Sequence, residues 1–219
     1  MYQPHVAMFD KVLWAKLRGL APLRSRPARS VLLRQGDPGT HVLLLESGSA
    51  IVTLTGENGE RTLLAVRGAG ELLGELAVLD AHPRTASVIA AEACQVRVIP
   101  APEFLGFVDE HGLTASILRH AIARVREAEA VRLELATAPV PARLASALGR
   151  LVQSASRRAD HVHVRLTQVE LSQLIGASRN AVGTAIKAWR DHGWLETEPG
   201  GGLLIRDIAR IKTHPLGRG

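Results

Sequence analysis

The chain has 219 residues, 46% of them hydrophobic, and a formal net charge of +6. This length allows a sizeable core in one domain or two. No apolar run is long enough to span a membrane and residues 1–19 lack a secretory-signal pattern, so we expect a cytoplasmic protein with no membrane partner. The single cysteine, Cys94, excludes an intrachain disulfide and a four-cysteine metal cluster.

Residues 30–100 alternate short β-rich runs with connectors rich in Gly, Asp, Asn and Pro. Many short strands at this spacing are typical of a small antiparallel barrel or a double-sheet roll. Cys94 falls in one of these runs, where we expect a small core residue. The expected strands are residues 30–33, 42–46, 50–55, 61–66, 87–90 and 96–99.

Residues 70–88 indicate a short helical turn and a loop placed between strands. Gly74 allows the backbone to approach a ligand closely, and the Glu75 carboxylate suits the hydroxyls of a ribose. Arg84 and Thr85 together suit a phosphate. We expect this site to be polar and open to solvent when empty. An ordinary surface ion pair between Glu75 and Arg84 is the alternative.

A long helix is expected over residues 112–138, followed by a break at Pro139 and Pro141, because proline lacks an N–H and clashes with the preceding turn. One stripe on the helix steps alternately by three and four residues, as in a coiled-coil seam. The seam favours a homodimer, although a helix packed on its own sheet would show a similar stripe. The stripe residues are Leu118, Ala121, Val125, Ala128, Arg132 and Leu135.

Two short helices joined by a tight turn follow in residues 166–189. Thr167 and Glu170 have the spacing of a capping box, Gly176 is suited to end the first helix, and Ser178 is suited to cap the second. The inner face of the first helix is assigned to Val169, Leu171, Leu174 and Ile175. Val182, Ile186 and Trp189 recur at helical spacing in the second.

This pattern indicates a helix-turn-helix, whose second helix reads bases in the DNA major groove. An ordinary helical hairpin is the alternative. The charge distribution favours double-stranded DNA: from Pro139 onward there are twelve basic and six acidic residues, whereas residues 1–138 carry fifteen of each. Residues 194–205 read as two strands around a Gly-rich turn, the wing of a winged helix. The expected DNA-binding residues are Thr167, Ser178, Arg179, Asn180, Gly183, Thr184 and Lys187.

With these motifs in this order, the chain resembles the CRP/FNR family of transcription regulators. The run from Gly74 to Ala77, followed by residues 83–86, is similar to the phosphate-binding cassette of bacterial cyclic-nucleotide-binding domains. The resemblance implies an α+β chain with an antiparallel, jelly-roll-like sensor roll in residues 1–111. It also implies a dimerisation helix in residues 112–138 and a winged helix-turn-helix in residues 139–219.

The resemblance further implies an effector such as cyclic AMP or another cyclic nucleotide. Glu75 would hold the ribose hydroxyl and Arg84 with Thr85 the cyclic phosphate, with backbone near Gly74 and Ala86 assisting. A palindromic operator and RNA polymerase are the implied macromolecular partners. The alternative within this class is a constitutive DNA-binding regulator with a vestigial sensor site.

Two departures from the family pattern affect specificity. Where members that bind cyclic AMP place a Thr-Ser pair that contacts adenine, this chain has Ala128 and Glu129, so the identity of the nucleotide stays open. On the recognition helix Arg179 suits guanine, but Asn180 and Thr184 replace a Glu and an Arg of the usual pattern, so we expect a different operator consensus.

Other chemistries are less well supported by the sequence. No Ser-His-Asp order, paired catalytic carboxylates, P-loop or dinucleotide fingerprint stands in a convincing context, which argues against an enzyme. One cysteine excludes iron–sulfur sensing of the FNR type, whereas haem sensing stays open because there are nine histidines. His161 and His163 form a pair that could bind metal, but alternation on an exposed strand or loop explains it better, and no metal is expected.

Overall fold

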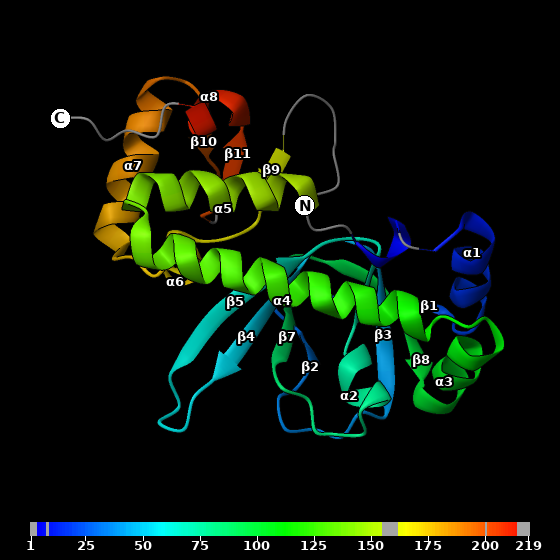
Figure 1. The fold of residues 1–219 in the computed structure, drawn as a ribbon. Helices are drawn as coiled ribbons and strands as arrows, with labels where there is room; N and C mark the ends of the chain where they lie inside the picture. The colour runs from blue at the N-terminus through cyan, green and yellow to red at the C-terminus, as the bar shows by residue number, and fades with distance from the viewer. Residues whose placement is uncertain (1–3, 8, 155–161, 200, 214–219) are drawn as a thin grey trace. The chain divides into compact units, whose positions relative to one another are not determined.

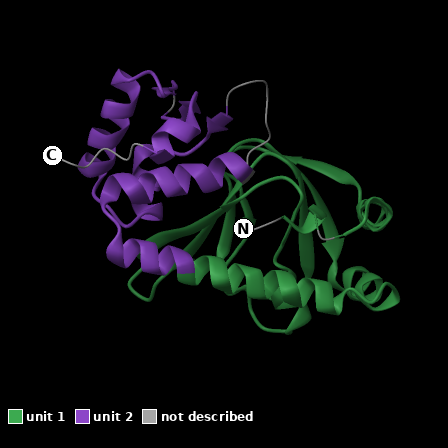
Figure 2. Ribbon diagram, turned by 45° about the horizontal axis from the view of Figure 1, so that its top comes forward, with its two compact units in different colours: residues 1–129 green, residues 130–219 purple. Residues whose placement is uncertain are grey.

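The computed structural model describes residues 4–7, 9–154, 162–199 and 201–213. The chain divides into two compact units, Met1–Glu129 and Ala130–Gly219, shown in separate colours in Figure 2. Unit 1 combines two antiparallel sheets with short helices, and unit 2 is mainly helical (Figure 1). No helix of the described residues is both long and apolar enough to cross a membrane.

Unit 1 is built on two four-stranded sheets in which every neighbouring pair of strands is antiparallel. The strand orders are β1-β8-β3-β6 and β2-β7-β4-β5. The strands are β1 (Leu23–Arg26), β2 (Val31–Leu33), β3 (His41–Ser47), β4 (Ala50–Thr55), β5 (Arg61–Arg67), β6 (Glu71–Leu73), β7 (Ser87–Ala90) and β8 (Cys94–Pro100). Each of the six strands expected from the sequence is present, so the roll is confirmed.

Strand β3 shows how the layers are arranged, because successive side chains of a strand point to opposite faces. Leu43 and Leu45 pack with residues of both sheets, including Val88 and Cys94, and form the interior of the roll. Val42 and Leu44 point the other way, into a second core shared with the helices. Both faces of β3 are therefore buried, which accounts for its continuous apolar run.

Helices cover that second core. They are the single turn η1 (His5–Ala7), α1 (Lys11–Gly19), α2 (Glu75–Leu79), α3 (Ala101–Glu110) and α4 (Thr114–Thr137). Leu17 of α1, Phe104 of α3 and Ile117 of α4 pack together with Leu44 in this core. The core therefore anchors the first turns of α4 on the roll.

Helix α4 ends at Thr137 and α5 (Val140–Ser154) begins three residues later, so the break expected at the prolines is present. Pro141 lies in the first turn of α5, where a missing N–H breaks no intrahelical hydrogen bond. Unit 2 continues with β9 (Val162–Val164), α6 (Gln168–Leu174), α7 (Arg179–Asp191), β10 (Leu195–Thr197), β11 (Leu203–Ile205) and α8 (Ile208–Thr213). Its three strands form an antiparallel sheet in the order β10-β11-β9.

Candidate functional site

The cassette expected to bind the effector begins where β6 meets α2. Gly74 joins them with a φ of +82°, in the left-handed region that favours glycine. A Cβ atom at this position would collide with Nη1 of Arg84. Glycine is therefore required both for the turn and for the close approach of the arginine.

Arg84 is held by backbone carbonyls rather than exposed. Its side chain donates to the carbonyl of Gly74 from Nη1 at 3.3 Å and to that of His41 from Nη2 at 2.6 Å. These hydrogen bonds use two of the five N–H groups of a guanidinium. Burial lowers the pKa of Arg84, and the nearby carboxylates of Asp37 and Glu75 oppose that shift. The structure thus presents a fixed, buried cation with donor capacity to spare.

Glu75, the first residue of α2, is 1% exposed. Its Oε1 atom accepts a hydrogen bond of 2.6 Å from Nη1 of Arg124, which comes from α4. Its Oε2 atom is buried and has no hydrogen-bond partner among the residues that the structure describes. Because a buried acceptor without a donor is costly, this oxygen is suited to receive a hydroxyl donor such as a ribose.

The expectation of an open, solvent-facing site is wrong for these two side chains. Arg84 is 4% exposed and Glu75 is 1% exposed, because backbone carbonyls and Arg124 enclose them. They do not form a surface ion pair. Thr85 is exposed and Ala86 is half-buried, so these neighbours border the buried pair. Sequence reasoning missed Arg124, since nothing in the spacing of a residue 49 positions from Glu75 indicates their contact.

Ala128 and Glu129 lie on α4 and are both exposed. Ala128 offers no side-chain hydrogen bond, and an ionised Glu129 can only accept. In the described residues, the donors and acceptors suited to ribose and phosphate are therefore gathered around α2, whereas this pair offers no side-chain donor to a base.

The local signals of the helix-turn-helix are confirmed. Thr167 caps α6 in a capping box: its hydroxyl accepts from the Glu170 N–H at 3.2 Å, and the Glu170 carboxylate accepts from the Thr167 N–H at 2.7 Å. Gly176 has a φ of +57° and follows the end of α6. Ser178 caps α7 by accepting from the Ala181 N–H at 3.2 Å. The assignment of Val169 to the inner face is wrong, because that side chain is exposed.

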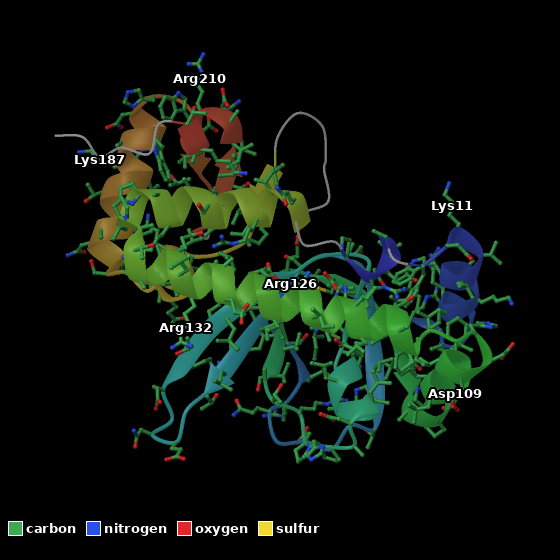
Figure 3. All side chains as sticks on the ribbon, in the orientation of Figure 1. Lys11, Asp109, Arg126, Arg132, Lys187 and Arg210 are labelled. Atoms are coloured by element: carbon green, nitrogen blue, oxygen red, sulfur yellow. The ribbon has the colours of Figure 1, made fainter. Side chains whose placement is uncertain are left out.

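Helix α7 separates into an inner and an outer face. Val182, Ile186 and Trp189 are buried, as their spacing predicted. On the other side the exposed residues are Ser178, Arg179, Asn180, Thr184 and Lys187, while Gly183 and the cap Thr167 are half-buried. Lys187 projects outward from α7 in Figure 3. The Thr184 hydroxyl donates to the carbonyl of Asn180 at 3.0 Å, so one of its hydrogen bonds is already used within the helix.

Polar side chains make close contacts across the small sheet beside this helix. His163 and Arg165, on and just after β9, contact Glu198 at 2.8 and 3.2 Å, and Arg206 pairs with Glu196 at 2.7 Å. His163 is thus engaged with a carboxylate, while His161 lies outside the described residues. The paired strands β10 and β11 occupy the place expected for the wing.

The roll followed by the helix-turn-helix defines a class of protein, a DNA-binding regulator. Residues 23–111 match the family of cyclic nucleotide-binding domains, and residues 142–213 match the Crp-like helix-turn-helix domain. The chain is 29% identical over 191 residues to the CRP-like cAMP-activated global transcriptional regulator of Mycobacterium tuberculosis, covering 84% of each chain.

Solved structures show the same fold. A CRP/FNR-family transcriptional regulator from Thermus thermophilus superposes with a TM-score of 0.67 at 23% identity, covering 90% of this chain and 100% of that one. FixK2 from Bradyrhizobium japonicum gives a TM-score of 0.72 at 16% identity, covering 91% and 99%. The chain belongs to the CRP/FNR family of transcription regulators.

Proposed function

We propose that this protein is a homodimeric regulator whose affinity for a palindromic operator is controlled by a cyclic nucleotide bound at Gly74, Glu75, Arg84, Thr85 and Ala86. The observation that carries the proposal is a buried Glu75 oxygen that has no hydrogen-bond partner in the described part of the chain, together with the buried guanidinium of Arg84. A ribose hydroxyl donates a hydrogen bond to the carboxylate oxygen, and a cyclic phosphate pairs with the guanidinium. The M. tuberculosis relative is named as cAMP-activated, which supports the same ligand class.

The contact between Glu75 and Arg124 supports a route from the effector to the dimer. Arg124 lies on α4 and holds Glu75 at 2.6 Å, so a ligand that hydrogen-bonds Glu75 acts on a carboxylate already tied to this helix. A ligand shifts a conformational equilibrium only by its differential affinity for the two states. The Arg124–Glu75 pair is a contact whose strength can differ between those states.

Exposed apolar side chains on α4 support the homodimer. Leu118 and Val125 are each 58% exposed, and Ile122 between them is also exposed. These residues are spaced by four and three and so share one helix face. A second copy of α4 with the same spacing buries this stripe, and two-fold symmetry then presents two recognition helices to two half-sites.

The outer face of α7 supports the DNA-reading role. Arg179 has two donors for bidentate bonding to guanine, and the Asn180 amide has the donor and the acceptor that adenine requires. Lys187 and Arg190 are exposed further along α7 and suit phosphates. RNA polymerase is the proposed protein partner of the DNA-bound dimer.

A constitutive regulator with a vestigial sensor is the second candidate. The observation that favours it is the side-chain chemistry of Ala128 and Glu129, which offers no donor to a base. The two candidates differ in whether a nucleotide binds and changes operator affinity.

One experiment separates the candidates. An operator is first selected from random double-stranded DNA with the full chain. Calorimetry then measures binding of cyclic AMP, cyclic GMP and cyclic di-GMP, and fluorescence anisotropy measures operator affinity with and without each. Saturable heat from one nucleotide and a matching change in operator affinity support the effector-controlled regulator. Tight operator binding with no heat from any of the three overturns it in favour of the constitutive regulator.

A further inference from the structure

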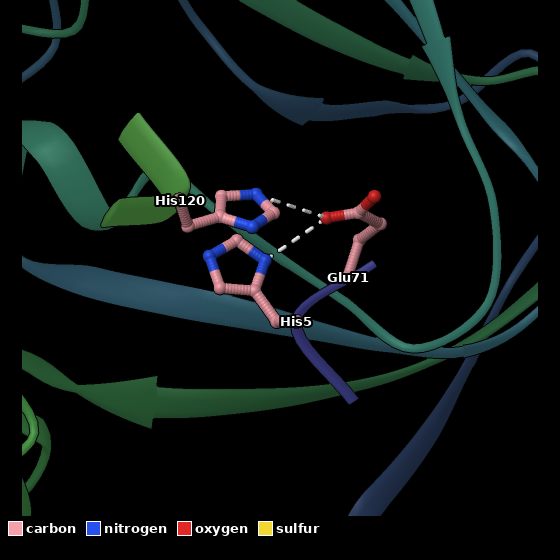
Figure 4. A group of neighbouring side chains, drawn as sticks. All are labelled: His5, Glu71 and His120. Carbon is pink, nitrogen blue, oxygen red and sulfur yellow. Dashed lines mark hydrogen bonds and ion pairs between the residues drawn. The ribbon is translucent and has the colours of Figure 1, made fainter. Parts of the chain in front are cut away.

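Three ionisable side chains from distant parts of the sequence meet inside unit 1. His5 comes from η1, Glu71 from β6 and His120 from α4, and they are 0%, 2% and 2% exposed. Figure 4 shows both imidazoles directed to the same carboxylate oxygen. Nδ1 of His5 lies 2.9 Å and Nε2 of His120 lies 3.7 Å from Oε2 of Glu71.

The potential ligand atoms of this cluster all lie within 4.8 Å of one another. The two imidazole rings are stacked, with centroids 3.5 Å apart and planes inclined by 30°. The single turn η1 is also fastened to the roll by its backbone, because the Val6 N–H donates to the Gly70 carbonyl at 2.9 Å. The three side chains are therefore held close together by backbone structure as well as by their own contacts.

The hydrogen bonds of His5 conflict with one another. The Leu72 N–H lies 3.1 Å from Nδ1 of His5, in a position to donate to that nitrogen. Oε2 of Glu71, an acceptor, lies 2.9 Å from the same nitrogen. A ring nitrogen of a neutral imidazole either donates or accepts, so neither tautomer of His5 satisfies both Leu72 and Glu71. The other ring nitrogen, Nε2, is buried with no hydrogen-bond partner among the described residues. The described residues therefore do not meet the hydrogen-bonding capacity of both ring nitrogens of His5.

An imidazole binds a metal ion in its neutral form, and burial favours that form in both histidines. Burial lowers the pKa of His5 to about 3; Glu75 opposes the shift, and Arg124 and Arg67 add to it. Burial, the neighbouring His5 and Arg124 likewise lower the pKa of His120 to about 3, although Glu71 opposes the shift. A neutral imidazole has a lone pair on one of its two nitrogens.

We propose that His5, Glu71 and His120 bind one divalent transition-metal ion of the zinc class. Two imidazole nitrogens and one carboxylate oxygen are a donor set that such ions prefer. A cation held by these atoms is attracted to the Glu71 carboxylate and connects η1, β6 and α4. The spacing of the three residues in the sequence does not indicate this site, and the proposal departs from the expectation that the chain holds no metal.

The site is placed to influence the effector cassette. Nη2 of Arg124 lies 3.8 Å from Oε2 of Glu71, while its Nη1 atom lies 2.6 Å from Glu75. A metal ion on Glu71 competes with Arg124 for that carboxylate, so the guanidinium is left to Glu75. The metal ion thereby strengthens the link between α2 and α4.

The test uses the full chain freed of metal by a chelator and titrated with Zn(II) against a chromophoric competitor. The wild-type protein is expected to bind one Zn(II) per chain with high affinity. His5→Gln and His120→Gln each remove a ligand and are expected to weaken that binding at least tenfold. His82→Gln is the matched control, because His82 is an exposed histidine of the same unit. Unchanged binding in both cluster variants, or no tight binding by the wild type, overturns the proposal.

A second measurement covers the case in which a cluster variant does not fold. Zn X-ray absorption on the zinc-loaded wild-type protein counts imidazole ligands directly. Two imidazoles with a carboxylate oxygen in the first shell support the site, and fewer than two imidazoles overturn it. These readouts use neither nucleotide nor DNA, so they do not depend on the proposed effector.

Discussion

Nη1 of Arg124 donates a hydrogen bond of 2.6 Å to Oε1 of Glu75, joining α4 to the first residue of α2. The carboxylate is almost fully buried, so the guanidinium provides the positive charge that a buried anion needs. The pair therefore has a structural role in the unliganded protein, besides the one proposed for it in effector binding.

Removing one partner of this pair is expected to be costly. Arg124→Ala leaves the Glu75 carboxylate buried without its cation and should lower the free energy of unfolding by about 3–5 kcal/mol. Adding Glu75→Gln removes the stranded charge, so the double variant should recover part of that loss. Urea denaturation of the two single variants and the double variant measures the coupling. If the double variant lost as much stability as the two single variants together, the pairing of Arg124 with Glu75 would be contradicted.

Arg84→Leu is expected to abolish most nucleotide binding, because it removes the cation proposed to hold the cyclic phosphate. It should also destabilise unit 1, since the carbonyls of Gly74 and His41 lose their donor. Arg84→Lys keeps the charge and separates the two effects. Calorimetry with the nucleotide that binds the wild type, alongside thermal melting, checks the outcome. Arg34→Leu is the control, because Arg34 is an exposed arginine of the same unit.

The acid stability of the roll is expected to depend on Glu46, which accepts hydrogen bonds from Arg18 at 2.7 Å and Arg97 at 2.6 Å. Burial raises the pKa of Glu46, but these arginines outweigh it and the net pKa lies below the ordinary value of 4.5. A depressed pKa contributes stability that is full above the unfolded-state pKa and is lost as the pH falls through the folded-state pKa.

Glu46→Gln should therefore lower the free energy of unfolding by about 1–2 kcal/mol at pH 7 and make its decrease below pH ~4.5 less steep. Denaturation at a series of pH values measures both effects. Glu57→Gln, at an exposed position, should change neither the free energy of unfolding at pH 7 nor its decrease at low pH. An equal pH dependence in the wild type and Glu46→Gln would contradict the assignment.

The parts of the fold that could be predicted from sequence are those specified by local signals. The capping box at Thr167, the glycine at 176 and the cap at Ser178 each depend on residues three or four positions apart. The alternating strands of the roll are specified in the same way. Strand β1 escaped prediction because its four residues are all exposed, so it has no apolar alternation to detect.

The candidate site was only partly predictable. Gly74, Glu75 and Arg84 come together as expected, but their burial depends on the His41 carbonyl and on Arg124, which are 43 and 49 positions away from their partners. The same holds for His5, Glu71 and His120, which come from three separate elements. Contacts set by the packing of distant elements leave no pattern in a single sequence.

The dimer is expected to depend on the exposed stripe of α4. Replacing Leu118 and Val125 with Asp should place charge in the proposed interface at a cost of several kcal/mol for each uncompensated group. Sedimentation should then show monomers, and operator binding should be lost. Val12→Asp with Leu64→Asp changes two other exposed apolar residues of unit 1 and serves as the control. A dimeric Leu118/Val125 variant would place the interface elsewhere.

The last prediction separates base reading from phosphate binding on α7. Arg179→Ala should weaken binding to the selected operator by about 1–3 kcal/mol and relax the preference for one guanine, because it removes a bidentate base contact. Lys187→Ala should weaken operator and random DNA alike and reduce the slope of log affinity against log salt by about one, since one phosphate contact is lost.

Anisotropy on both DNAs across a range of salt concentrations distinguishes these effects, with Lys11→Ala as a control at an exposed lysine of unit 1. Operator footprints unchanged by Arg179→Ala would show that α7 does not read bases through this residue. Equal losses on operator and random DNA would instead place Arg179 on a phosphate, because only a base contact discriminates between the two sequences.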